Sequence, residues 1–200
     1  MAARLRHNIV VKQRLDFFGK SAASEAAAIF ADNLYWFRLF RRSVHLASDV
    51  LSDAVIQRGA KQRLIASLLL GRLSTTTQAG ALLVRRGFTH EAAALVRLSF
   101  EVFVLLRACC EQDGFWRRYR DSDLVRQRKL AVGGQQLSAF SRLERDRLNR
   151  SQERLEREIA KRGAKEIKIE ETARSLGMAD EYNSLYRLTS PAVHSAPEIL

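Results

Sequence analysis

An arginine and a histidine near the end of the chain have the types and spacing for acid–base chemistry on a phosphate. Arg187 and His194 are seven residues apart, so on a continuous helix they lie on one face. A histidine exchanges a proton near neutral pH, and an arginine holds an anionic oxygen with a planar fork of donors. Together they are the minimum set for cleaving RNA without a metal. Hydrogen-bonding side chains close by in the sequence are Tyr182, Asn183, Tyr186 and Ser190.

A second pair of charged residues stands in the most apolar stretch of the chain. Within residues 92–110, 15 of 19 residues are apolar, and Arg97 and Glu101 are four residues apart. A charge inside a core is costly unless it is paired and hydrogen-bonded. The pair is therefore either a structural pair that fixes the register of a helix, or part of a polar pocket in which Glu101 positions another group. Our leading hypothesis is one pocket formed by Arg97, Glu101, Arg187 and His194.

Two stretches, GALLVRRGFTHEAAALVRLSFEVFVLLRA and YNSLYRLTSPAVHS, resemble an uncharacterised bacterial all-helical family, domain of unknown function 5677. The likeness extends over residues 60–196, which is most of the chain. The matching features are an Arg–Glu pair on the central helix and a late Tyr–Arg–Ser–His run. In this chain those residues are Arg97, Glu101, Tyr186, Arg187, Ser190 and His194.

The spacing R-x6-H is also similar to that of the HEPN superfamily, a group of helical nucleotide-binding and RNA-cleaving domains with the signature R-x(4–6)-H. This resemblance implies a metal-independent endoribonuclease with Arg187 and His194 as catalytic residues, and a site built across a homodimer. HEPN nucleases usually carry a polar residue directly after the arginine, where this chain has Leu188. The chain ends six residues after His194, whereas the resemblance implies that related chains continue beyond this point.

The elements that must position these residues are helices. Phe30, Phe37, Val44 and Leu51 recur every seven residues and predict a long amphipathic helix over residues 25–57. Glycines and caps then predict helices over 61–86, 90–111, 113–134, 138–162 and 170–176, and a last one from residue 178. The helix over 90–111 is apolar on all sides, so we expect it at the centre of the fold.

Two of these helices have unusual features. The helix over 138–162 has a narrow apolar stripe and dense mixed charge, which predicts a peripheral helix that projects from the body or packs on a second subunit. In the last helix, Ser190–Pro191 resembles an N-cap followed by proline, so we expect a kink or a break there. The predicted fold is an all-α, HEPN-like helical bundle: a single domain over 25–200, preceded by a basic arm or helix over 1–24.

The charge of the chain is positive and unevenly distributed. The net charge is +12, and residues 1–100 hold 15 lysines and arginines against 6 acidic residues. A basic surface suits a polyanion, and the candidate partners are RNA, a nucleotide or a second copy of the chain. The alternative that needs no polyanionic partner is an arginine-rich chain that uses arginine for solubility. No stretch is apolar enough to span a membrane, and the one adjacent cysteine pair suits a reducing cytoplasm.

Motifs for other chemistries are absent from the sequence. There is no dinucleotide or P-loop motif and no zinc motif, and we expect no cofactor. His45, Asp49 and Asp53 share one helix face, but a solvated row is favoured over a metal site. Three functions remain open: a metal-independent endoribonuclease, a non-catalytic module that binds a nucleotide, RNA or protein, and a helical scaffold whose polar cluster is structural. The distance between His194 and the Arg97–Glu101 pair separates these alternatives best.

Overall fold

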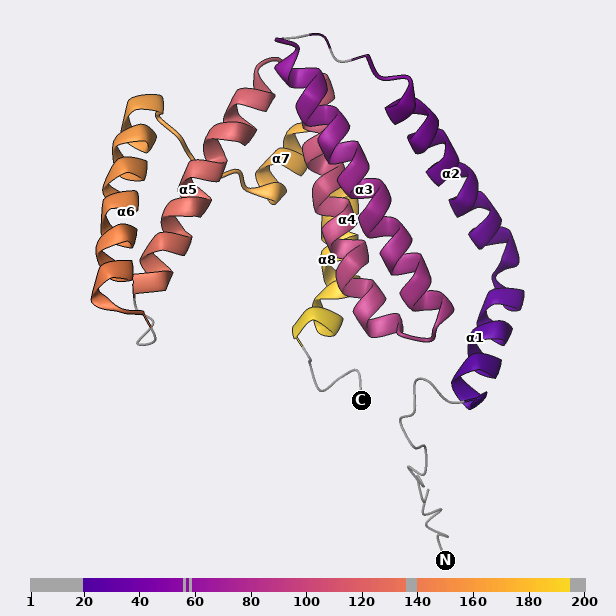
Figure 1. The fold of residues 1–200 in the computed structure, drawn as a ribbon. Helices are drawn as coiled ribbons and strands as arrows, with labels where there is room; N and C mark the ends of the chain where they lie inside the picture. The colour runs from indigo at the N-terminus through magenta and orange to yellow at the C-terminus, as the bar shows by residue number, and fades with distance from the viewer. Residues whose placement is uncertain (1–19, 56, 58, 136–139, 195–200) are drawn as a thin grey trace, which may run out of the picture.

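The structure is a computed structural model that describes residues 20–55, 57, 59–135 and 140–194, without the side chains of 20–22, 25 and 190–194. Every regular element in these ranges is an α-helix, as the sequence predicted. The helices form a bundle around one antiparallel pair, with a helical hairpin on one side (Figure 1). Within the described part, no helix is both long and apolar enough to cross a membrane.

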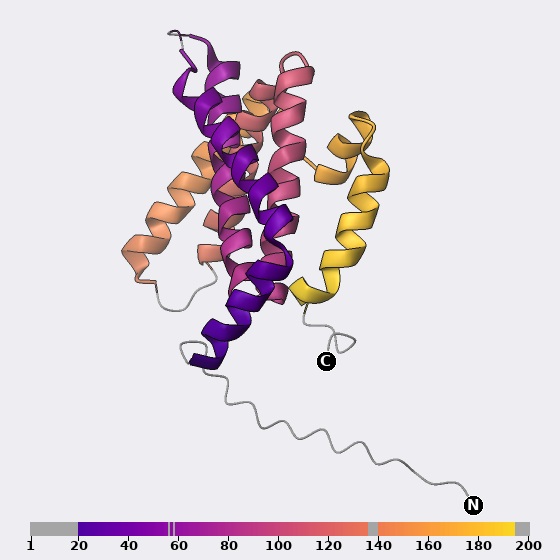
Figure 2. The ribbon, with the colours of Figure 1, turned by 90° about the vertical axis from the view of Figure 1, so that its right-hand side faces the viewer.

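The central pair consists of α3 (Lys61–Arg85) and α4 (Thr89–Glu111). Both lie within two residues of the predicted bounds. Gly87 joins them in a left-handed backbone conformation, with φ 84°, which glycine adopts without steric cost. The buried side chains of α4 include Phe100, Val104 and Cys109. Helix α3 packs on one side of α4, and α7 and α8 pack on the other (Figure 2), so the prediction that α4 is central is confirmed.

The predicted helix over 25–57 is two helices, α1 (Lys20–Asp32) and α2 (Leu34–Ser52). They meet at Asn33, whose side-chain amide donates a hydrogen bond to the Ile29 carbonyl (3.0 Å). Asparagine competes with the backbone in this way and is a poor residue for a helix interior. The apolar repeat continues across the break, and Phe30, Phe37, Val44 and Leu51 are all half-buried. Both helices pack against α3 (Figure 1).

Helices α5 (Phe115–Gln135) and α6 (Arg142–Arg162) form the hairpin. Helix α6 packs on α5 alone among the described elements, which confirms that it is peripheral (Figure 1). It begins at Arg142, four residues later than predicted, because Ser141 and Glu144 form a capping box there. It ends at Gly163, which adopts a left-handed conformation.

The chain ends in α7 (Ile169–Ser175) and α8 (Ala179–His194), which bring the candidate residues onto α4. Of the two alternatives predicted at Ser190–Pro191, the break is wrong, because α8 continues through Pro191 to His194, and the kink stays a prediction. A proline removes the N–H group that would bond the carbonyl four residues earlier, here that of Arg187. Arg187 is exposed, so water can bond its carbonyl and the helix can continue.

Candidate functional site

Helix α8 presents two different faces. Tyr182, Leu185, Tyr186 and Thr189 are half-buried or buried, at the spacing of one helical stripe. Tyr182, Leu185 and Tyr186 pack with Phe100, Val104 and Ala173. The residues between them in sequence are exposed, namely Asn183, Ser184, Arg187 and Leu188. The stripe therefore turns the two tyrosines toward α4 and leaves Arg187 on the outward face.

Four residues of α4 and α8 form what we term the tyrosine cluster: Arg97, Glu101, Tyr182 and Tyr186. The Tyr186 hydroxyl donates a hydrogen bond to Glu101 Oε1 (2.5 Å). Arg97 Nε donates to the same oxygen (3.4 Å), and its guanidinium lies 4.0 Å from the centre of the Tyr186 ring. The Tyr182 ring stacks on the Tyr186 ring, with 4.1 Å between the two ring centroids. One carboxylate oxygen thus accepts from a phenol and a cation, and the cation also covers the phenol ring.

The surroundings of Tyr186 keep its phenol protonated. Burial, followed by the hydrogen bond to Glu101 and the charge of that carboxylate, raises the pKa of Tyr186 far above its ordinary value. Arg97 acts in the opposite direction but does not outweigh these effects. Tyr186 is therefore a hydrogen-bond donor at neutral pH and not a base. Arg97 and Glu101 keep 23% and 30% of their side-chain surfaces exposed, so the pair is half-buried, not enclosed as the sequence suggested.

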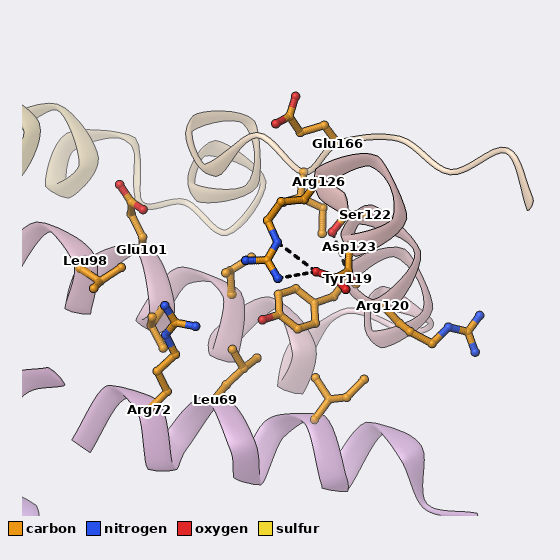
Figure 3. A pocket seen from close by; sticks show the side chains of 14 residues that line it. Leu69, Arg72, Leu98, Glu101, Tyr119, Arg120, Ser122, Asp123, Arg126 and Glu166 are labelled. Atoms are coloured by element: carbon orange, nitrogen blue, oxygen red, sulfur yellow. Dashed lines mark hydrogen bonds and ion pairs between the residues drawn. The ribbon is translucent and has the colours of Figure 1, made fainter. Parts of the chain in front are cut away.

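Glu101 also stands at one end of a cavity of about 490 Å³ between α3, α4, α5 and the segment before α7, which we term the Glu101 cavity. Figure 3 shows the Glu101 carboxylate pointing away from Tyr119 and Asp123 at the other end. There Asp123 accepts hydrogen bonds from Arg126 (2.6 and 3.0 Å). Burial opposes ionisation of Asp123, but the bonds from Arg126 and Gln127 outweigh it and lower its pKa. The cavity is lined by balanced charges.

The structure brings only some of the predicted site residues together. Arg97, Glu101, Tyr182 and Tyr186 are in contact, in the tyrosine cluster. Arg187 is exposed, and no hydrogen bond or ion pair joins it to any other described residue. The backbone of Ser190 and His194 is helical, but their side chains lie outside the described residues. The prediction that the His194 ring lies near Glu101 therefore concerns a side chain outside the described residues, and it stays a prediction.

Other candidate residues lie apart from this region. His45, Asp49 and Asp53 are all exposed, as expected of a solvated row. Among the residues that the structure describes, no three His, Cys, Asp or Glu side chains are close enough to hold a metal ion. The adjacent cysteines do not bridge each other, and Cys109 is fully buried beside Gln62.

Sequence reasoning missed the residues that complete the Glu101 cavity. Arg72 on α3, Tyr119 and Asp123 on α5 and Glu166 before α7 come from three separate segments. Only the Asp123–Arg126 pair carries a local signal, because residues three apart on a helix are neighbours. The inward orientation of Tyr186 had a clear signal in the i, i+3, i+4, i+7 spacing of Tyr182, Leu185, Tyr186 and Thr189.

Comparison with known proteins bears on the whole of this region. The model of a family of unknown function, DUF5677, matches residues 63–200. No curated protein and no solved structure matches the chain. The matched residues make up more than half of the chain and contain nearly all of α3 as well as α4–α8, with the tyrosine cluster and the Glu101 cavity. The chain therefore belongs to the DUF5677 family, as the resemblance in its sequence predicted.

Proposed function

We propose that the protein binds RNA at the outward face of α8 and cleaves it without a metal, with Arg187 and His194 as the catalytic residues. The observation that carries the proposal is an arginine that is exposed and free of any carboxylate in the described part, on a helix that continues to His194. On that helix the two residues are seven apart, so their Cα–Cβ bonds leave from one face. An unpaired guanidinium keeps its fork of donors for a phosphate.

The reaction that suits these two side chains is attack by the ribose 2′-hydroxyl. His194 takes the proton of that hydroxyl, the 2′-oxygen forms a bond to phosphorus, and the bond from phosphorus to the 5′-oxygen breaks. The proton then passes to the leaving 5′-oxygen, and the products are a 2′,3′-cyclic phosphate and a 5′-hydroxyl. Arg187 stabilises the negative charge that develops on the phosphorus oxygens.

The tyrosine cluster acts as a support in this proposal. Its polar groups satisfy one another, so Arg97, Glu101, Tyr182 and Tyr186 are positioning residues that hold α8 against α4. A catalytic pair needs such support because small displacements are costly in rate. Ser190 is a further candidate for hydrogen bonding to the phosphate, from its place between Arg187 and His194 in the sequence.

The test is cleavage of a labelled RNA by purified protein in excess EDTA, with analysis of the new ends. His194→Ala should lower the rate by about 10²–10⁴, and Arg187→Ala by about 10²–10³. Arg187→Lys should restore little, because a point charge does not reproduce the fork. Arg63→Ala also removes an exposed cation that has no ion pair with any described residue, so it is the matched control and should leave the rate unchanged. DNA of the same sequence should resist, because it lacks the 2′-hydroxyl.

A non-catalytic RNA-binding or nucleotide-binding module is the second candidate. Leu188, directly after Arg187, leaves 76% of its surface exposed and places an apolar side chain beside the proposed phosphate site. Such a side chain suits contact with a base or a protein partner better than proton transfer. Salt-sensitive RNA binding without any new RNA ends would support this module and contradict cleavage. Light scattering at several concentrations would test the expected homodimer.

A further inference from the structure

A second groove lies between α2 and α3, on the other side of the central pair from α8. Unlike the Glu101 cavity, it is lined by cations without carboxylates among the described residues. It encloses about 540 Å³, and its residues come from α1, α2 and α3. Its polar lining consists of three arginines and one glutamine, while the rest is apolar: Arg38, Arg41, Arg85, Gln78, Phe30, Leu34, Phe37, Phe40, Val44, Ala81 and Leu82. We term it the basic groove. No carboxylate lines it among the described residues.

The three arginines of the basic groove face solvent without a counter-ion. Arg38, Arg41 and Arg85 are exposed, and no ion pair joins any of them to a carboxylate in the described part of the chain. Arg38 and Arg41 are one helical turn apart on α2, and Arg85 stands across the groove on α3. Three like charges that meet in one groove repel one another, so an anion placed between them is stabilised by all three.

The floor of the groove is aromatic. Phe30 and Phe37 are half-buried, and their ring centroids are 5.1 Å apart. The Arg85 guanidinium lies over the Phe30 ring, 4.6 Å from its centroid. Arg85 is exposed, so its planar guanidinium remains accessible to a ligand. A nucleic-acid base stacks on such a plane, and the stacking tolerates any base.

We propose that the basic groove binds a single strand of RNA, with its phosphates on Arg38 and Arg41 and a base stacked on Arg85. A strand suits the groove better than an isolated anion, because arginines from both α2 and α3 and the aromatic rings line the same groove. The proposal concerns binding alone and does not require the cleavage reaction at α8. Helix α2 precedes the residues matched by the DUF5677 model, so the groove combines a family helix with a segment outside the match.

The experiment measures binding of a labelled oligouridylate to the full chain by fluorescence anisotropy over a range of salt concentrations. Arg38→Gln/Arg41→Gln should weaken binding at low salt. It should also reduce the slope of log affinity against log salt by about 1.4, since each phosphate contact on a single strand contributes about 0.7. Arg85→Lys keeps the charge but loses the plane, and should weaken binding on the order of 10-fold. An RNA duplex should bind less well, because its bases are stacked already.

The matched control is Arg63→Gln/Lys165→Gln. It removes two exposed cations that do not line the groove and that form no ion pair within the part of the chain that the structure describes. If this control weakens binding as much as Arg38→Gln/Arg41→Gln, the attraction comes from net charge and the proposal is wrong. Wild-type affinity in the Arg85→Lys variant would contradict the stacked base. Binding without cleavage by the wild-type chain would refute only the proposed reaction, whereas cleavage by Arg38→Gln/Arg41→Gln with unchanged affinity would refute only the groove.

Discussion

The arginines on the two sides of the α3–α4 pair have different surroundings. On the α8 side, Arg97 bonds Glu101 and lies over Tyr186, so its charge is neutralised and partly covered. On the α2 side, Arg38, Arg41 and Arg85 line a groove that has no carboxylate among its described residues. The difference shows that paired charge serves to dock a helix, whereas unpaired charge is kept where solvent or a ligand can reach it.

The free-energy cost of removing an arginine from water explains why the half-buried arginine is paired and the exposed arginines are not. A half-buried cation such as Arg97 would lose hydration without a partner, and Glu101 and the Tyr186 ring replace that hydration. The exposed arginines of the basic groove keep their hydration, so they need no partner in the free protein. Changes to the tyrosine cluster should therefore lower stability, while changes to the basic groove should alter ligand binding and leave stability almost unchanged.

The largest expected effect is that of removing the Tyr186 side chain. Tyr186→Ala removes the hydrogen bond to Glu101, the stacking on Tyr182 and the contact with Arg97. We expect the free energy of unfolding to fall by about 2–3 kcal/mol, at the low end for an aromatic residue because the side chain is only half-buried. Urea denaturation measures the change. Tyr35→Ala is the control, because Tyr35 is 71% exposed, and equal losses in the two variants would contradict the docking role.

A smaller effect should come from removing the carboxylate. Glu101→Leu leaves Arg97 half-buried without its partner and leaves the Tyr186 hydroxyl without its acceptor. We expect a loss of about 1 kcal/mol in the free energy of unfolding. Glu111→Leu is a close control, because Arg107 and Glu111 form an ion pair at the same spacing on the same helix without a tyrosine. If both variants lose the same free energy, the tyrosine adds nothing to the pair.

Local sequence signals were enough for most helices and failed where a local competition decided the structure. The bounds of α3, α4 and α7 follow from periodicity and from glycines such as Gly87, and the structure agrees within two residues. The break at Asn33 was missed because the apolar repeat continues through it, although the Asn33 backbone departs from helical geometry (φ −113°, ψ 20°) and its side chain bonds the Ile29 carbonyl. A repeat of seven does not detect such a bond.

The candidate site also contains residues that local sequence signals predicted and contacts that they missed. The sequence placed Arg97, Glu101, Arg187 and His194 in one pocket, with Tyr182 and Tyr186 near Arg187 in the sequence. The structure brings Tyr182 and Tyr186 to Arg97 and Glu101, because the neighbours of Tyr186 at i−4 and i+3 set the buried face of the helix. Arg187 has no bond to the pair among the described residues, and the contact of His194 stays a prediction. The basic groove was not predicted at all. Its character depends on which helices pack together and on the absence of a carboxylate from the described residues that line it, and neither is encoded locally.

A pH dependence sharpens the assignment of Tyr186 as a buried donor. Its pKa is raised in the folded protein, so the folded state holds the proton more strongly than the unfolded state, whose tyrosine titrates near about 10. The stabilisation is therefore complete below about pH 10 and is lost as the pH rises toward the folded-state pKa. Tyr186→Phe should cost about 1 kcal/mol at neutral pH.

The comparison of wild type with Tyr186→Phe isolates this residue from the other tyrosines and from Cys109, whose pKa burial also raises. The two chains should differ in unfolding free energy by a constant amount up to about pH 10, and the difference should shrink above that value. Urea denaturation at a series of alkaline pH values measures it. A difference that stays constant or widens above pH 10 would show that the phenol ionises at least as readily in the folded chain as in the unfolded one.

The smallest expected effect concerns the basic groove and has the opposite sign. Arg41→Gln removes one of three like charges around the groove, and glutamine has nearly the same helix propensity as arginine. At low ionic strength the free energy of unfolding should rise by a few tenths of a kcal/mol, because repulsion from Arg38, three residues away, is relieved. About 0.5 M salt should remove the gain, since it screens exposed charges within a few ångströms. Arg63→Gln, outside the groove, should show no gain at any salt concentration, which guards against a general effect of net charge. A loss of stability on Arg41→Gln would mean that this side chain is held by a partner and is not free for a ligand.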